Sequence, residues 1–310
     1  MLIENLTTEN VNDYKDFLKE DNAELIGRNF VSGFVLISDD ESIPKAGIIW
    51  ELINSEDEFE TNCRILFIRA EDEESADALL SQYSDLVIMM ECEKSVFELP
   101  ATLGTIEKNA LENAGFELST EEGNVICLAL ADLGMAIVTD KDKIRDDIKR
   151  LSKADERLFD TAMAELEMDG ISGACSDLSY LSKDFFENEI STFLDDEGEI
   201  SAMVLFHKKP SGIIEIDLMS TVGDSDADPV DLLKQSIMYS DEIYDPNTKF
   251  LIDLRDKDLN ALVQKYFSKF KGSKVIKGFR KEDLLPSDEQ DDEDIEYIED
   301  IEDEDIYDLY

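Results

Sequence analysis

The chain is poor in the residues that most often build metal and catalytic sites. It has a single histidine, His207, and its four cysteines are widely separated, at Cys63, Cys92, Cys127 and Cys175. Zinc ligands come from closely spaced cysteines and histidines, so this spacing excludes an ordinary zinc centre, and a disulfide framework is not expected in a chain this long. A Ser-His-Asp or Cys-His site would have to use His207, and no serine stands in a glycine-rich elbow.

The single histidine and two of the cysteines are expected to have structural and not catalytic roles. His207 ends an expected strand beside Lys208 and Lys209, which predicts an exposed surface position. Cys63 and Cys127 fall in or beside expected strands, where a thiol behaves as a small buried hydrophobe.

Positive charge is scarce as well. The chain has 29 basic against 76 acidic residues, a formal net charge of -47. This surplus repels phosphates and anionic lipids, so it excludes nucleic acid and membrane surfaces as partners. A basic protein or a cationic small molecule remains compatible, and in the alternative interpretation the acidity only confers solubility.

Long apolar runs are also absent. No run approaches the roughly 18 residues that a membrane-spanning helix needs, and the first residues lack the basic and apolar regions of a signal peptide. A cytoplasmic location is therefore expected.

Hydrophobic periodicity predicts a similar order of elements in two successive halves. In the first half it predicts helix 9–20, strands 30–37, 46–53 and 64–69, helix 75–83, strand 86–92, helix 105–114, and a closing hairpin of 116–118 and 124–130. In the second half it predicts helices 140–151 and 154–168, strands 189–194, 200–208 and 213–219, helix 230–239, strand 249–254, helix 257–270 and strand 274–279. Hairpins followed by one strand-helix-strand crossover indicate an α/β (α+β) fold, with a mixed, mainly antiparallel sheet flanked by helices in each half. We predict domains at residues 1–135 and 136–285.

Residues 286–310 differ in kind from the rest. From Ser287 to Tyr310 there is no lysine or arginine, and acidic residues alternate with isoleucine, leucine and tyrosine. This composition is typical of a disordered acidic tail. Three roles stay open: docking in a basic groove of a partner, solubility alone, or contact with the lysine cluster of Lys265, Lys269, Lys271, Lys274 and Lys277.

The order of elements resembles the GNAT superfamily of N-acetyltransferases. Ala46-Gly-Ile-Ile-Trp50 is similar to its third strand, and Asn109-Ala-Leu-Glu-Asn-Ala-Gly-Phe116 to its last helix. Ser191 to Met203 similarly resembles its strand-turn-strand. The resemblance covers nearly everything before the tail, as two tandem divergent copies. It implies acetyl-CoA as cofactor and, in an active protein, acyl transfer to a cationic amine such as a polyamine, an aminoglycoside or a protein lysine.

The family holds the pyrophosphate of acetyl-CoA on a loop of the form Gln/Arg-x-x-Gly-x-Gly/Ala. The resemblance implies cofactor contacts at Arg69, Ala70 and Ser75 in the first half and at Gly223 in the second. In the first half Asp72 and Glu74 replace the small residues of this pattern, and in the second Asp224, Asp226 and Asp228 follow the one glycine. A carboxylate about 4 Å from a phosphate repels it by roughly 1 kcal/mol even in water. The departures favour a regulatory or interaction module with degraded acetyl-CoA loops over an active acyltransferase.

The positions that the resemblance implies to be catalytic also depart from the family's pattern. The family's usual tyrosine, which protonates the leaving thiolate, falls at Leu111, and leucine cannot donate a proton. Tyr266 is the candidate acid of the second half, with packing beside Phe267 and Phe270 as the alternative. The candidate bases for the incoming amine are Glu51 in the first half and Glu215, or its neighbour Asp217, in the second.

No metal site is predicted. The run Asp224-x-Asp226-x-Asp228 lacks the later glycine and the closing glutamate of a calcium loop.

Overall fold

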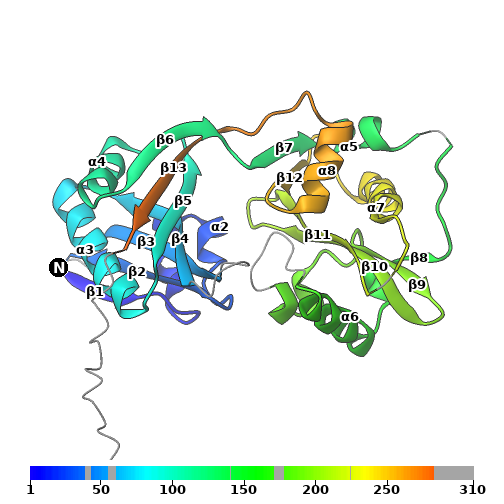
Figure 1. Cartoon of the computed structure of the whole chain (residues 1–310), viewed down its shortest axis with the longest axis horizontal. Helices are drawn as coiled ribbons and strands as arrows, with labels where there is room; N and C mark the ends of the chain where they lie inside the picture. Colours follow the sequence, from blue (N-terminus) through cyan, green and yellow to red (C-terminus); the bar gives the residue numbers. More distant parts are fainter. Residues whose placement is uncertain (39–42, 55–60, 140, 171–177, 224, 283–310) are drawn as a thin grey trace, which may run out of the picture.

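The computed structural model has two β-sheets lying next to each other, each covered by helices (Figure 1). The structure describes residues 1–38, 43–54, 61–139, 141–170, 178–223 and 225–282. The predicted acidic tail, residues 286–310, therefore lies outside the described residues, as does Asp224. Within the described residues, the predicted α/β class with mixed, mainly antiparallel sheets flanked by helices is confirmed.

The first sheet has seven strands in the order β1-β2-β3-β4-β5-β13-β6. These are β1 (Leu2–Asn5), β2 (Val31–Ile37), β3 (Pro44–Asn54), β4 (Thr61–Ala70), β5 (Lys94–Pro100), β13 (Lys274–Lys281) and β6 (Glu117–Glu122). Only β4 and β5 are parallel, and α3 (Glu73–Met89) makes the crossover between them. One face packs on α3 and α4 (Thr105–Asn113), and the other on η1 (Val11–Tyr14), α1 (Lys15–Leu18) and α2 (Glu20–Ala23).

The second sheet has six strands in the order β7-β12-β11-β10-β9-β8. These are β7 (Val125–Ala129), β12 (Lys249–Asp253), β11 (Ile214–Thr221), β10 (Glu199–Lys208), β9 (Thr192–Asp196) and β8 (Ile148–Arg150). Again only one pair, β11 and β12, is parallel, and α7 (Pro229–Ile243) joins the two strands. The two sheets thus repeat one plan.

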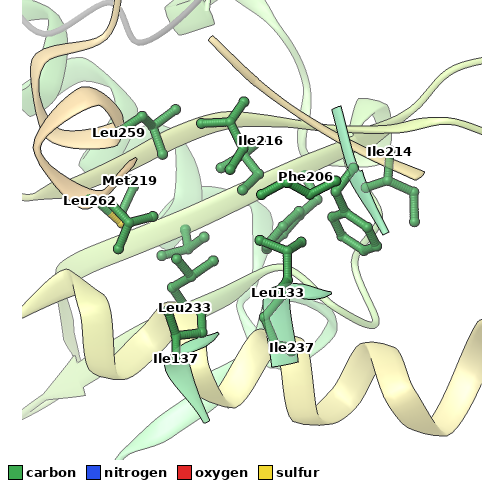
Figure 2. Packing of buried hydrophobic residues seen from close by; sticks show 14 of the residues in the cluster. Leu133, Ile137, Phe206, Ile214, Ile216, Met219, Leu233, Ile237, Leu259 and Leu262 are labelled. Carbon is green, nitrogen blue, oxygen red and sulfur yellow. The ribbon is translucent and has the colours of Figure 1, made fainter. Parts of the chain in front are cut away.

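Helices also cover both faces of the second sheet. One face packs on α5 (Leu130–Ile137), α7 and α8 (Lys257–Tyr266). Figure 2 shows this core, in which Ile137 and Leu233 lie below Ile216 of the sheet. The other face packs on α6 (Glu156–Met168) and on the short turns η2 (Leu151–Lys153), η3 (Leu178–Tyr180) and η4 (Lys183–Phe185).

The two halves exchange strands. β7 does not pair with β6 but runs antiparallel to β12 in the second sheet. β13, near the other end of the chain, is inserted between β5 and β6 of the first sheet, where Figure 1 shows it in brown among blue and green strands. The predicted closing hairpin of 116–118 and 124–130 is therefore wrong, although both strands exist. The domain division at residue 135 stays a prediction, and each sheet takes one strand from across it.

Three predicted elements are corrected. Residues 86–92, predicted as a strand, continue α3 to Met89, because Tyr83 and Val87 face the core one helical turn apart. Residue 140 of the predicted helix 140–151 lies outside the described residues, and residues 141–151 are instead loop, β8 and the start of η2. The predicted helix 9–20 is broken into η1, α1 and α2, since Lys19 has a positive φ of 70°. Cys63 is buried as predicted, whereas Cys127 is exposed because β7 is an edge strand.

Candidate functional site

One irregularity recurs at the same place in both sheets. In β4 the register against β3 shifts by one residue at Leu66, directly after Ile65, the last residue that pairs with β5. In β11 the register against β10 shifts at Asp217, directly after Ile216, the last residue that pairs with β12. Each bulge therefore marks the point where the parallel pair separates. The match places Leu66 and Asp217 at equivalent positions of the two halves.

In the turn between β4 and α3, backbone N–H groups donate to carboxylates of the chain itself. The Asp72 side chain accepts the backbone N–H of Ser75 at 2.8 Å and caps α3. The N–H and hydroxyl of Ser75 lower the pKa of Asp72, so this acid is held as a carboxylate. Glu107 of α4, which is 8% exposed, accepts the N–H of Ala70 at 3.0 Å. These carboxylates therefore occupy backbone N–H groups of the kind that bind phosphates at helix N-termini.

The other first-half candidates are also engaged elsewhere. The Arg69 guanidinium donates to the Phe17 carbonyl at 2.8 Å and lies 4.6 Å from the centre of the Phe17 ring. Arg69 therefore holds α1 on the sheet. Leu111, at the family's tyrosine position, is fully buried in the core beneath α3 and α4.

The second-half loop follows the same pattern. Asp228 accepts the N–H of Val230 at 3.0 Å and caps α7, with Pro229 in the first turn. Gly223 has a φ of 60°, and a side chain there would meet Glu165 of α6. A carboxylate therefore occupies the N-terminus of α7, as Asp72 does in α3.

A cavity of about 320 Å³ lies beside this loop. It is formed by the end of β11, the first turn of α7 and one side of α8, and its lining residues are Met219, Thr221, Asp228, Pro229, Val230, Asp258, Ala261, Leu262, Lys265 and Tyr266. Tyr266, a predicted acid, is thus in the cavity wall, with the Lys265 ammonium 4.9 Å from its ring centre. The walls are mainly apolar, and the charged groups at the rim are two carboxylates and one ammonium.

The predicted bases do not converge on Tyr266. Glu51 of β3 is buried and forms an ion pair with Arg64 of β4. Glu215 forms an ion pair with Lys209 at 2.8 Å. Glu215 lies on the face of β11 opposite to the cavity, because Ile214 and Ile216 beside it point into the core under α7 and α8. No acid-base pair is assembled from these residues.

Asp217, named with Glu215 as a candidate base, belongs to a polar cluster on that opposite face, and the sequence analysis did not predict its association with His207. His207, predicted as exposed, is 8% exposed and bonds to Glu24 of the first half through Nε2 at 3.1 Å. Asp217 is 1% exposed, and burial, followed by the charge of Glu215, raises its pKa to about 8. Acidic residues at positions 215 and 217, alternating with buried isoleucines, were the available signal.

Residues 1–282, apart from the gaps given above, contain no group of three or more His, Cys, Asp or Glu side chains placed to hold a metal ion. Over the same residues, no helix combines the length and apolarity needed to cross a bilayer.

Comparison with known proteins gives structural matches only. No protein-family model and no curated protein sequence matches the chain. A tandem GNAT protein from the clavulanic acid biosynthesis pathway matches with a TM-score of 0.56 and 10% identity, over 92% of this chain and 100% of that one. A conserved Enterococcus faecalis V583 protein described as a probable N-acyltransferase matches with a TM-score of 0.50 and 13% identity, over 91% and 73%.

A third match is one region of a larger, multi-domain protein. It is the GCN5-related glucosamine N-acetyltransferase region of a fungal multi-domain β-N-acetylglucosaminidase, with a TM-score of 0.52 and 9% identity, over 90% of this chain and 38% of that one. At these identities the similarity concerns the fold alone.

Proposed function

We propose that this chain, which has the GNAT fold twice in tandem, acts as an interaction or regulatory module whose two acetyl-CoA loops no longer hold the cofactor. One observation carries the proposal. Asp72 and Asp228 occupy the helix N-termini at which the family binds pyrophosphate, and each accepts a backbone N–H there. A phosphate would have to displace a carboxylate and then lie beside it, which is unfavourable on both counts.

The proposed partner is a basic protein or another cationic molecule. The net charge of -47 attracts cations and speeds their association at low ionic strength. This choice also follows from the exclusion of nucleic acids, whose phosphates the same charge repels.

Acetyl-CoA is expected to leave the melting temperature of the full-length protein unchanged up to millimolar concentration. A ligand that binds only the native state stabilises it by about 2.7 kcal/mol at a hundredfold excess over its Kd, so even weak binding is measurable. Differential scanning fluorimetry at low and moderate salt checks this. A saturable rise in melting temperature would overturn the proposal.

Restoring small residues to the first loop is expected to create acetyl-CoA binding. The variant Asp72→Gly/Glu74→Gly/Glu107→Ala removes the carboxylate cap and frees the N–H of Ala70, giving a ligand phosphate the donors it needs. Glu71→Gly is the matched control, because it removes one carboxylate from the same turn without clearing these donors. We expect saturable stabilisation by acetyl-CoA in the triple variant and none in the control. Equal behaviour of the two would show that the carboxylates are not what prevents binding.

A second function is favoured by one observation, the 320 Å³ cavity that contains Tyr266. In this alternative the second half transfers an acyl group from acetyl-CoA to a cationic amine, with Tyr266 as acid. Acetyl transfer to spermidine, measured by release of free CoA thiol, tests it. Activity that is lost in Tyr266→Phe would support it and would contradict the non-catalytic module.

A further inference from the structure

The two halves are joined by two chain segments that run side by side. One links β6 to β7 through Gly123 and Asn124, and the other leads from α8 to β13 through Gly272 and Ser273. The Gly123 N–H donates to the Ser273 carbonyl at 2.8 Å, and a side chain on Gly272 would lie 2.0 Å from the Gly123 carbonyl oxygen. Only glycine fits at position 272. The two crossings therefore form one narrow, double-stranded connection, seen at the top of Figure 1.

Away from this connection, a separate set of contacts holds the halves together. In Figure 1, α2 of the first half lies below the crossings and faces the second half. Glu24, directly after α2, bonds to His207, and the Asp21 side chain accepts the backbone N–H of Ser211 at 2.8 Å. Phe30 packs edge-on against Tyr180 with ring centres 5.8 Å apart. Two of these contacts are hydrogen bonds to Asp21 and Glu24, and polar contacts of this kind are typical of domain interfaces that open and close.

His207 is placed so that both of its ring nitrogens face acceptors. Nδ1 lies 3.0 Å from the Phe185 carbonyl oxygen, and Nε2 lies 3.1 Å from a Glu24 carboxylate oxygen. A neutral imidazole has one N–H, so it can satisfy only one of these acceptors, whereas the imidazolium donates to both. The ring is also stacked on Phe185, with centres 4.0 Å apart and planes within 7°. The closed contact is built for protonated His207.

Charged groups from several elements surround this ring. On the first-half side they are Asp21 of α2 and, after this helix, Glu24 and Arg28. The Arg28 guanidinium carbon lies 5.9 Å from the centre of the Phe185 ring. On the second-half side they are Lys209, Glu215 and Asp217. In and beside η4, Asp184 is exposed, Lys183 donates to the Ala154 carbonyl and Glu187 accepts from Tyr244, so these three are directed elsewhere.

We propose that the two halves move about the paired crossings at Gly123 and Gly272 as a hinge, and that the contact of His207 with Glu24 is a latch that is closed while His207 is protonated. Opening the latch separates α2 from the Pro210 turn and widens the hollow of about 440 Å³ that Pro210 and residues of η1, α1 and α2 line. The device goes beyond the proposed function, because it operates with or without bound acetyl-CoA.

The direction of the pH effect follows from His207. Burial lowers the pKa of His207, but its bonds to Glu24 and Phe185 raise it, and the net shift is upward. Its stabilisation is therefore complete below the ordinary histidine pKa and is lost as the pH rises through the raised value. Loss of the His207 proton loosens the latch as the pH rises above about 6.5.

Amide hydrogen exchange of the full-length protein provides a direct test. The Ser211 N–H is bonded across the interface to Asp21, whereas the adjacent Gly212 N–H is bonded to the Lys209 carbonyl of its own half. We expect the protection factor of Ser211 to fall about tenfold from pH 6 to pH 9, because His207 loses the proton with which it donates to both Glu24 and Phe185. Gly212 should keep its protection factor over this range. Equal protection of Ser211 at both pH values would overturn the latch.

Three variants separate the latch from general stability. His207→Phe keeps the stacking on Phe185 but cannot be protonated, so Ser211 should be weakly protected at every pH. Glu24→Gln keeps an acceptor but loses the charge that favours the imidazolium, so the transition should move to lower pH. Glu20→Gln is the matched control on α2, since Glu20 pairs with Lys15, and it should behave as the wild type. A wild-type pH response in His207→Phe, or an unshifted one in Glu24→Gln, would contradict the proposal.

Discussion

Deletion of residues 273–310 is expected to unfold the first half of the protein, although none of its first 135 residues is removed. β13 pairs with β5 from Lys281 and Lys94 to Val275 and Pro100, and with β6 on its other side. Without it, both strands lose their ladder partners, and the buried Ile276 and the close contact of Gly278 with the Phe97 ring are lost with them. A gap of one strand inside a sheet leaves two unpaired edges and an open core.

Tryptophan emission measures this effect. Trp50, the single tryptophan, is 2% exposed and packs between Phe34 and Tyr83 in the core of the first half. The deletion should shift its emission to the red and abolish its cooperative unfolding transition. Removal of residues 283–310 alone is the matched control, because it leaves β13 in place, and it should leave the emission unchanged. A folded, blue-emitting Trp50 in the longer deletion would show that β13 is not needed for this sheet.

The first sheet depends on a strand from near the other end of the chain, and this limits what sequence analysis could predict. The alternation in residues 274–281 predicts a strand whichever sheet it joins, because periodicity reports one buried face and not the identity of the neighbour. The two-residue connection at Gly123 and Asn124 is typical of a hairpin, yet here the chain continues into the other sheet. Local sequence patterns were enough to predict most strands and the crossover helices, and to recognise the resemblance to the GNAT superfamily. The exchange was not predictable, because its strand partners lie at least 120 residues apart in the sequence (249 − 129 = 120 for Lys249 and Ala129) and leave no local signal.

The strand predicted at 86–92 failed for a related reason. A short apolar run can be a buried strand or the end of a helix, and periodicity alone does not separate them. The run belongs to α3, where Val87 is buried and Met89 is 75% exposed. The preceding turns of the helix decide the outcome, since they carry the same buried stripe through Leu79, Leu80 and Tyr83.

The site could be predicted in part. The missing glycines and the carboxylates at Asp72 and Asp228 are visible in the sequence, and the structure adds that both cap the helices that follow. Glu107 was not predicted, because its bond to Ala70 requires α4 to dock at the end of β4. The contact of Glu24 with His207 was also unpredictable, since it depends on how the two halves meet.

Replacement of Arg280 by methionine is expected to cost about 3–5 kcal/mol of unfolding free energy, the usual effect of leaving one member of a buried ion pair alone. Arg280 of β13 pairs with Glu282 at 2.8 Å, and the two side chains are 10% and 4% exposed. Its guanidinium also donates to Ser84 of α3 at 2.9 Å and to the Ala114 carbonyl at the end of α4 at 3.0 Å. Arg280 thus ties the exchanged strand β13 to α3 and α4, the two helices that cover one face of the first sheet.

Urea unfolding followed by Trp50 emission tests this role, with two comparisons that isolate the buried charge. Arg280→Met/Glu282→Leu removes both charges, so it should recover much of the stability that Arg280→Met loses. Lys271→Met breaks an ion pair with Glu122 that is equally short, 2.7 Å, but exposed, and it should have no measurable cost. If Arg280→Met were as mild as Lys271→Met, β13 would be held by its backbone ladder alone. If the double variant were no more stable than Arg280→Met, the bonds to Ser84 and Ala114, and not the stranded carboxylate, would account for the loss.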